Sequence, residues 1–481
     1  MSLLPLRSTN RRTAHSTFWA GKWKAYIVPM VLTSFLLQLL FLGNMSYLFG
    51  ALLKSTTRMH NLKILAIDFD GGDIGKAISS AYSNLKSDEF PSLEFSSSSE
   101  YQTPESVREA VCDRGYWGAV YTHSGASERL LTAIEGDNTT VYNPSDAVTY
   151  IFNGAYYPAV SSSFKGSLQT LLSVASKLYP FASPDALKAV NMTNPMSAGA
   201  LLNPFEGTAW DIMPTNQGTR VLLNTVSMVM PILMQFFFQM ALNGVMGNAK
   251  VLETQSKRDI YVFRLGSSKV YTFISALVTT GYFWAFREGW GVTSGQFFET
   301  WMCIWFYMDI NYLLLDTVIG TVIPMQFFSF FLLTWIIVNI ASTVYPFDLT
   351  PGFYHWSWAL PAHNIWLLLV GIWSGCRSSL DETLPILFAW WLVVHFSSAW
   401  SVRRRCLMAE AEAEAQRARP TGDKFTQSQQ SVLGRMSTRA SGQAAKERSS
   451  DNYDLEAYRL DESLPNGDAG GTMINAPLST E

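Results

Sequence analysis

Long tracts without a charged residue dominate the pattern along the chain. Six such tracts occupy residues 25–53, 221–249, 270–286, 317–347, 349–376 and 383–402. A helix that crosses a bilayer core needs about 20 mostly apolar residues. A further stretch, residues 297–315, is equally aromatic and aliphatic but contains Glu299 and Asp309. The pattern therefore predicts a polytopic α-helical membrane protein.

Basic residues flank these tracts in a consistent way. Residues 1–24 contain Arg7, Arg11, Arg12, Lys22 and Lys24 and no acid, and the positive-inside rule assigns such a segment to the cytosol. If six helices cross, the basic loop 250–269 and the arginines at 403–405 also face the cytosol. Both termini are then cytosolic, and residues 54–220 lie outside.

Six crossings require that the apolar stretch 358–373 does not cross, because a seventh crossing would place residues 403–405 outside. This stretch contains Pro361, His363, Asn364 and Gly371. These residues suit a broken, re-entrant or interfacial element that is shielded by protein. Seven crossings remain the alternative.

Strand and helix patterns alternate in residues 54–220. Strands are expected at 62–69, 93–95, 117–121 and 148–152, and helices at 74–85, 104–112, 124–134 and 164–178. This alternation predicts an extracytoplasmic α/β domain between helices 1 and 2.

The charge-free tracts also divide the chain. We expect a cytosolic N-terminus, transmembrane helix 1, the α/β domain, a membrane domain with helices 2–6 and a disordered cytosolic tail, at 1–24, 25–53, 54–220, 221–402 and 403–481. The tail begins with an Ala- and Glu-rich helix at 408–418 and continues with few aliphatic residues, a composition typical of disorder.

Three motifs in the α/β domain resemble catalytic or ion-binding sites. Asp68 and Asp70 end the first strand, as in phosphatases with an aspartate nucleophile, but the downstream acidic motif that would hold Mg²⁺ is not found. Phosphate-loop and calcium-loop spacings also fail. An Asp-rich turn after a strand is the preferred interpretation, so we expect no enzyme, cofactor or metal site. Asn138 and Asn191 begin glycosylation sequons on the external side.

The composition excludes further classes. Only 15% of the 481 residues are charged and the net charge is −3, so no basic face for nucleic acid is expected. Four cysteines, at positions 112, 303, 376 and 406, form no zinc or disulfide framework. One bridge, between Cys112 and Cys376, is conceivable, but single cysteines are more often small buried hydrophobes.

Polar side chains at bilayer depth are functional candidates, because each costs about 2.5–3.5 kcal/mol to insert. The candidates are Asp309, Asp316, Glu299, Asn311 and Asn339. Asp309 and Asp316 are seven residues apart, hence on one helix face where they could line a cavity. The slightly favoured alternative places Asp316 at the cytoplasmic boundary and bonds Asp309 to Gln235, Gln239 or Asn339 as packing.

One stretch carries a family resemblance. Residues 345–354 read Tyr-Pro-Phe-Asp-Leu-Thr-Pro-Gly-Phe-Tyr, and Gly-Tyr-Trp-Gly-Ala stands at 115–119. With the order of one span, an external domain and five spans, the chain resembles the fungal nitrosoguanidine-resistance membrane-protein family. That family is similar in layout to membrane subunits of type-two ABC exporters and to phage-infection-type proteins. The motif residues are Pro346, Pro351, Gly352, Phe353, Tyr354, Pro361 and Asn364.

The resemblance implies a fungal plasma-membrane protein that affects tolerance of toxic small molecules, through export or lipid distribution. Membrane lipids, lipophilic small molecules and a further copy of the chain are the implied partners. The sequence has no nucleotide-binding motif, so energised export would need a partner ATPase or transporter, a proton-coupled step through Asp309 or a downhill substrate. The alternative is a non-transporting regulator or scaffold of other lipid or drug transporters; a phosphatase at Asp68 is the least favoured hypothesis.

Overall fold

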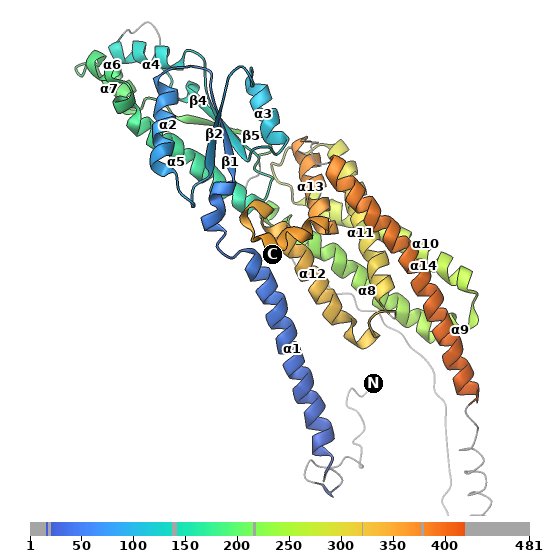
Figure 1. Cartoon of the computed structure of the whole chain (residues 1–481). Coiled ribbons are helices and arrows are strands. Elements are labelled where there is room, and N and C mark those ends of the chain that lie inside the picture. The colour runs from blue at the N-terminus through green and yellow to red at the C-terminus, as the bar shows by residue number, and fades with distance from the viewer. Residues whose placement is uncertain are drawn as a thin grey trace, which may run out of the picture. The chain divides into compact units, whose positions relative to one another are not determined.

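A mixed sheet and a set of long helices make up the part of the chain that the computed structural model describes, namely residues 16–17, 21–136, 142–214, 218–319, 321–376 and 380–418 (Figure 1). The chain divides after Ala413 into two units. The first unit holds an α/β region and a helical region. Of the second unit, only the last residues of the final helix are described.

The sheet of the α/β region has the strand order β2-β1-β3-β4-β5. Its strands are β1 (Lys63–Asp68), β2 (Ser92–Ser96), β3 (Gly118–Thr122), β4 (Val148–Phe152) and β5 (Gly207–Asp211). Only the β3–β4 pair is antiparallel. The first four strands lie where the sequence predicts them. β5 was not predicted, because its Gly-Thr-Ala-Trp-Asp sequence is not an apolar run and none of its residues is buried.

Alternate side chains of the sheet enter two separate cores, as the period of two along a strand requires. Ile64 and Ala66 of β1 face a core that includes α2 (Asp73–Leu85), α4 (Ala126–Glu135) and α5 (Pro158–Ala182), whereas Leu65 and Ile67 face α3 (Pro104–Cys112). Figure 1 shows α2 and α5 on one side of the sheet and α3 on the other. Two short helices, α6 (Pro184–Ala189) and α7 (Pro195–Leu202), complete this region.

The helix start predicted at residues 103–106 is confirmed. Thr103 accepts a hydrogen bond from the Ser106 amide at 3.2 Å, and Pro104 occupies the first turn of α3. Such a capping box satisfies two backbone N–H groups that the helix leaves free.

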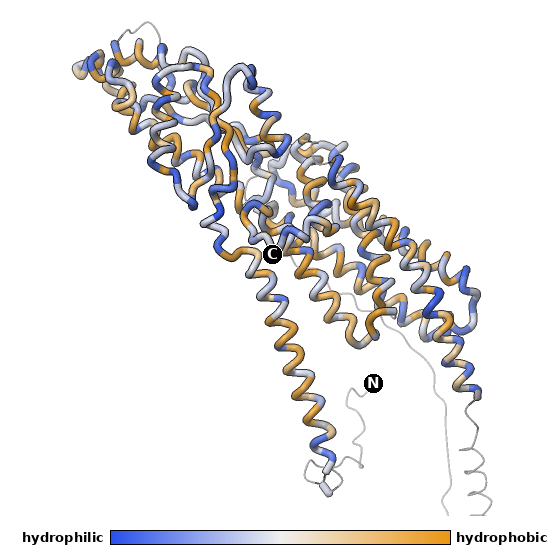
Figure 2. The backbone as a smooth tube through the Cα atoms, in the orientation of Figure 1, coloured by the Kyte–Doolittle hydropathy of each residue, from blue (hydrophilic) through white to orange (hydrophobic). Residues whose placement is uncertain are grey.

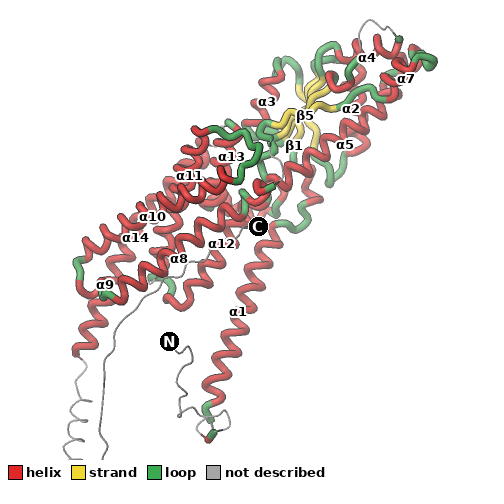
Figure 3. The backbone as a smooth tube through the Cα atoms, turned by 180° about the vertical axis from the view of Figure 1, so that it is seen from behind, coloured by secondary structure: helices red, strands yellow, loops and turns green. Residues whose placement is uncertain are grey.

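The helical region contains eight α-helices among the described residues. They are α1 (Trp23–Ala51), α8 (Val226–Asn248), α9 (Val251–Thr254), α10 (Lys257–Ala285), α11 (Ser294–Val318), α12 (Phe328–Val344), α13 (Pro361–Ser374) and α14 (Leu380–Ala418). Figure 3 shows the strands gathered in one sheet, away from these long helices. Two 3₁₀ segments, η6 (Phe347–Leu349) and η7 (Gly352–Ala359), connect α12 to α13.

Three helices, α1, α8 and α14, are long and apolar enough to cross a membrane by length and composition. Figure 2 shows α1 as a hydrophobic run over most of its length. α12 is apolar but has 17 residues, while α10 and α11 have 29 and 25 residues and contain charged side chains. The chain is therefore a helical membrane protein.

The helix that contains the third predicted crossing begins before the charge-free tract 270–286. The loop expected at 250–269 is mostly helix, because α10 begins at Lys257. Arg264 and Lys269, counted in the sequence as cytosolic loop charges, thus lie inside a helix. The stretch 358–373 corresponds largely to α13, whose 14 residues are mostly buried by protein. At 1.5 Å per residue this helix is about 21 Å long, less than the roughly 30 Å hydrocarbon core, which favours an element that does not cross alone.

A disulfide joins the two regions. Cys112, the last residue of α3, is bonded to Cys376, which follows α13, with the Cα atoms 5.0 Å apart. The expectation of unpaired cysteines is therefore wrong for this pair, because the fold brings together residues separated by 264 positions. Cys303 and Cys406 are free and buried, as expected.

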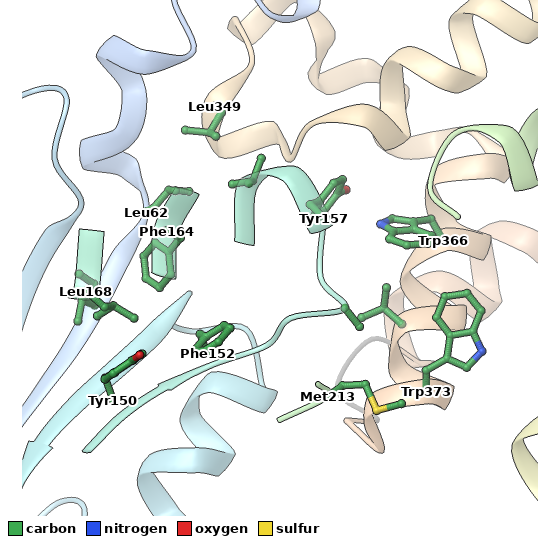
Figure 4. Close-up of a cluster of buried hydrophobic side chains, with 14 of the residues drawn as sticks. Leu62, Tyr150, Phe152, Tyr157, Phe164, Leu168, Met213, Leu349, Trp366 and Trp373 are labelled. Carbon is green, nitrogen blue, oxygen red and sulfur yellow. The ribbon is translucent and has the colours of Figure 1, made fainter. Parts of the chain in front are cut away.

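The two regions also share one hydrophobic core. Tyr157 at the start of α5 lies against Trp366 of α13, with ring centroids 6.2 Å apart. Figure 4 shows Tyr157 and Phe152 of the α/β region in one cluster with Leu349, Trp366 and Trp373 of the helical region. The α/β region is thus packed directly onto the helices that follow it in the chain.

Candidate functional site

Asp309 and Asp316 lie inside the helical region, on the same helix, α11. Their exposed fractions are 3% and 1%. Each carboxylate has its own set of partners, and no hydrogen bond or ion pair joins the two sets directly. We call them the Asp309 cluster (Lys269, Asp309, Trp391, His395) and the Asp316 cluster (Arg264, Asp316, Ser398, Arg405).

The Asp316 cluster is a closed ion pair network. Arg264 of α10 forms a direct ion pair with the Asp316 carboxylate, and Arg405 of α14 lies 3.0 Å from the same oxygen. Arg264 also donates to Asn243 Oδ1 at 3.0 Å, and Ser398 lies 3.5 Å from the other carboxylate oxygen. Buried charges are tolerated when they are paired and hydrogen-bonded in this way. The cluster therefore holds α10, α11 and α14 together.

The Asp309 cluster is open by comparison. Lys269 of α10 forms an ion pair with Asp309 Oδ2, Trp391 Nε1 donates to that oxygen at 3.0 Å, and His395 Nε2 lies 3.9 Å from it. Lys269 Nζ and His395 Nε2 are 2.9 Å apart. Asp309 Oδ1 has no hydrogen-bond partner within the described part of the chain. The side chains of Lys269 and His395 are 31% and 18% exposed, so part of this cluster lies at the surface of the protein.

The packing partners expected for Asp309 were wrong. Gln239 donates to the Tyr312 carbonyl at 2.6 Å, Asn339 bonds to backbone groups, and the side-chain amide of Gln235 has no partner among the described residues. A buried carboxylate is better stabilised by a cation than by a neutral amide. The sequence could have pointed to Arg264 and Lys269, because these two cations precede the apolar tract 270–286. The next apolar stretch, 297–315, contains Asp309, and Asp316 follows it directly.

The remaining polar candidates do not join these clusters. Asn311 Oδ1 accepts from Trp335 Nε1 of α12 at 2.9 Å, and Asn339 Oδ1 accepts from the Ala362 amide of α13 at 3.3 Å. Both therefore link neighbouring helices. Glu299 is exposed, near the first turns of α11. The five predicted residues thus do not form a single hydrogen-bonded cluster.

Part of the family motif fixes α1. The Tyr354 hydroxyl donates to the Tyr47 carbonyl of α1 at 2.7 Å. A Cβ atom on Gly50 would come within 2.3 Å of that hydroxyl, so a side chain at position 50 would displace it. Phe353 is 70% exposed, and Pro351 and Gly352 start η7.

The rest of the motif joins the two regions. Asp348, two residues after Pro346, accepts a hydrogen bond from Trp117 Nε1 at 3.0 Å, and its carbonyl accepts from Asn61 at 2.8 Å. Pro361 starts α13, and Asn364 donates to the Trp358 carbonyl at 2.8 Å. We call this contact between the α/β region and the helical region the joint. Burial there raises the pKa of the Tyr156 hydroxyl to about 12, and the hydroxyl is neutral. The two stretches that carry the resemblance therefore contact each other.

Asp68 and Asp70 fix a turn at the end of β1. Asp68 Oδ1 accepts from the Gly71 amide at 2.9 Å and from the Thr122 hydroxyl at 2.6 Å. Asp70 accepts from the Ser127 amide at 3.1 Å. The described residues include no group of three or more side chains that could hold a metal ion. This geometry matches the preferred interpretation of an Asp-rich turn.

The two sequons differ in what the structure describes. Asn191 is exposed, and its side chain accepts a hydrogen bond from the Thr193 hydroxyl at 2.7 Å. Asn138 lies outside the described residues, as does the tail beyond residue 418.

Residues 33–396, from α1 into α14, match a family model described as a protein of unknown function, DUF3533. The chain belongs to the DUF3533 family. The match includes the α/β region, the joint and all of the Asp309 cluster, whereas Ser398 and Arg405 of the Asp316 cluster lie beyond it.

A relative in Saccharomyces cerevisiae is an uncharacterized endoplasmic reticulum membrane protein. It is 23% identical to this DUF3533 chain over 390 residues, which cover 72% of the chain and 73% of the relative. No solved structure matches. Together with the apolar helices, these comparisons identify a membrane protein of the DUF3533 family.

Proposed function

We propose that this DUF3533 protein crosses the membrane six times, through α1, α8, α10, α11, α12 and α14, with the α/β region outside the cytosol and both termini in it. Pairing of charges inside α10 and α11 supports their insertion, because a paired ion is less costly in a membrane than a single one. The Cys112–Cys376 disulfide supports an extracytoplasmic α/β region, since disulfides persist in oxidising compartments.

Glycan mapping tests this topology. Peptide N-glycosidase F should shift the gel mobility of the full-length protein, and the Asn138→Gln/Asn191→Gln double variant should migrate like the digested wild type. An Asn191→Gln single variant separates the two sites. A cytosolic protease that cleaves the α/β region in intact cells would contradict the topology.

We further propose that the protein moves lipophilic small molecules or lipids across the membrane, with the Asp309 cluster as its proton-responsive centre. The observation that carries this proposal is the open Asp309 carboxylate, which faces Lys269 and His395 and has one oxygen without a described partner. A proton that binds Asp309 neutralises the carboxylate and weakens the ion pair with Lys269. When the proton leaves, the ion pair re-forms, so the contact between α10 and α11 follows protonation.

The resemblance to the nitrosoguanidine-resistance family supports toxic lipophilic molecules or lipids as the substrates. It also favours the plasma membrane, whereas the yeast relative is named as an endoplasmic reticulum protein. We propose the plasma membrane. Fluorescence microscopy of the full-length protein, tagged at its C-terminus, distinguishes a peripheral ring from a perinuclear one.

Reconstitution tests the transport proposal. Purified full-length protein in liposomes should move a fluorescent phospholipid or rhodamine 6G faster when a proton gradient is present. Asp309→Asn should abolish the gradient dependence without lowering the amount of folded protein, whereas Glu253→Gln, which changes an exposed acid on α9, should have no effect. Full gradient-driven flux in Asp309→Asn would remove this carboxylate from the mechanism.

The second candidate function is a regulator or scaffold of other transporters, and α1 favours it. Among the described helices, α1 packs mainly against α12, and Val28, Val31 and Leu42 are 59%, 56% and 64% exposed. Such a face can contact lipid or the helix of a partner. No flux under any gradient, together with loss of drug tolerance when these three residues are changed to alanine, would favour the regulator.

A further inference from the structure

A cavity of about 600 Å³ lies between the first turns of α11, the end of α13 and the start of α14. Its wall is mostly apolar and includes Phe298, Met302, Leu368, Ile372 and Leu380. Small-molecule sites in proteins commonly have about 300–1,000 Å³ and walls of this kind. The cavity is distinct from both ion clusters, since none of their residues lines it.

Hydrogen bonds fix the wall of this cavity. Gln296 Nε2 donates to the Ile372 carbonyl at 2.8 Å and to the Trp373 carbonyl at 3.1 Å, while its Oε1 accepts from the Thr293 amide at 2.8 Å. One side chain therefore ties the end of α13 to the start of α11. Cys376, which also lines the cavity, is held by its disulfide to Cys112. A wall held in this way is formed before a ligand arrives.

Glu299 supplies the charge of the cavity. It is exposed and lines the cavity, and no hydrogen bond or ion pair is found for it among the described residues. No lysine, arginine or histidine belongs to the described lining. The first turn of α14 adds Asp381 and Glu382 next to Leu380, and Glu382 lies 3.6 Å from Arg114. Among the described residues, the charges that line the apolar wall or adjoin it in sequence are therefore negative.

We propose that this cavity binds lipophilic cations, with the apolar body of the ligand against Phe298, Met302 and Ile372 and its positive charge at Glu299. Apolar burial supplies affinity, and a carboxylate beside a low-dielectric wall attracts a cation more strongly than one in open water. An anion of the same shape would be repelled. The proposal rests on the proposed function in one respect, because it names the charge class of the transported molecules.

Two ions of matched shape test the proposal. Tetraphenylphosphonium and tetraphenylborate have nearly the same size and opposite charge. Full-length protein in neutral-lipid nanodiscs is dialysed against each ion, and empty nanodiscs correct for partition into lipid. We expect saturable binding of tetraphenylphosphonium and no saturable binding of tetraphenylborate. Equal saturable binding of both ions, or of neither, would overturn the proposal.

Variants locate the binding. Glu299→Gln should weaken tetraphenylphosphonium binding at least tenfold, and Met302→Trp, which fills the cavity, should abolish it. Glu253→Gln is the matched control and should bind like the wild type. Unchanged binding in Glu299→Gln would overturn the assignment, and thermal melting of each variant excludes unfolding as the cause of a loss.

Nanodisc composition distinguishes the two sources of such a cation. Discs of phosphatidylcholine offer a choline headgroup as a competitor, and discs of a neutral diglucosyl glycolipid do not. Weaker tetraphenylphosphonium binding in the choline discs supports a lipid headgroup as the native cation, and equal binding supports a free lipophilic molecule. Because binding is measured without flux, it can persist when gradient-driven transport fails, and the two proposals fail separately.

Discussion

The Asp309 and Asp316 clusters have the same plan, in which an aspartate of α11 faces basic side chains of α10 and α14, but they differ in how fully the aspartate is paired. Asp316 meets two arginines and a serine; Arg264 and Ser398 are buried, and the Arg405 side chain is 9% exposed. Asp309 meets a lysine and a histidine that are partly exposed, and one of its oxygens has no described partner. A carboxylate with partners on both oxygens fixes the helices around it, whereas an oxygen without a partner leaves Asp309 available for another contact. This difference is why we propose a structural role for Asp316 and a functional role for Asp309.

The largest expected effect is the loss of the Asp316 carboxylate. Asp316→Ala leaves two buried guanidinium groups without their counter-ion, and removal of one partner from a buried pair typically costs about 3–5 kcal/mol. The variant should show a greatly reduced yield of monodisperse protein and a clearly lower melting temperature in detergent. Asp259→Ala, which removes an exposed acid from α10, is the control. Wild-type melting of Asp316→Ala would break the comparison.

The next largest effect on stability is expected when the disulfide is removed. This change tests whether the ion clusters alone hold the helices in place. Cys376→Ala should lower stability by about 2–4 kcal/mol, because the bridge restricts the unfolded chain. Limited proteolysis should then release the α/β region sooner. Cys303→Ala removes a buried thiol without a bridge and should show a smaller change. Equal protease resistance of both variants would mean that the shared core suffices.

Asp309→Asn should have a modest effect on stability, about 1–2 kcal/mol, because Lys269 is 31% exposed and can be hydrated after it loses its partner. Melting curves of Asp309→Asn and Asp316→Asn, recorded side by side, measure the difference between the clusters. If Asp309→Asn melted as low as Asp316→Asn, the Asp309 cluster would be structural as well.

The smallest expected effect concerns the joint. Asp348→Ala removes the acceptor of the Trp117 side chain but keeps the backbone carbonyl that binds Asn61. A loss of about 1 kcal/mol is expected, with no change in gradient-driven flux. The exposed Asp113 provides the control variant, Asp113→Ala. A flux defect in Asp348→Ala would extend the functional centre to the joint.

The sequence predicts the α/β region well, because buried strands and amphipathic helices have local periodicities. β1 through β4 and the capped start of α3 follow from such patterns. The ionic partners of Asp309 and Asp316 did not follow. The positive-inside rule counts lysines and arginines along the chain but does not distinguish a loop charge from one that pairs inside the bundle, so Arg264 and Lys269 were assigned to the wrong environment. The Cys112–Cys376 bridge was considered but not favoured, because its cysteines share no motif.

The disulfide also sets an order of events during biosynthesis. Cys376 follows Cys112 by 264 residues, so the bond cannot close until most of the polypeptide has been synthesised and α13 has taken its place. Until then Cys112 stays a free thiol beside a newly folded sheet, within reach of oxidoreductases. Completion of α13 is therefore the step at which the nascent protein becomes covalently locked.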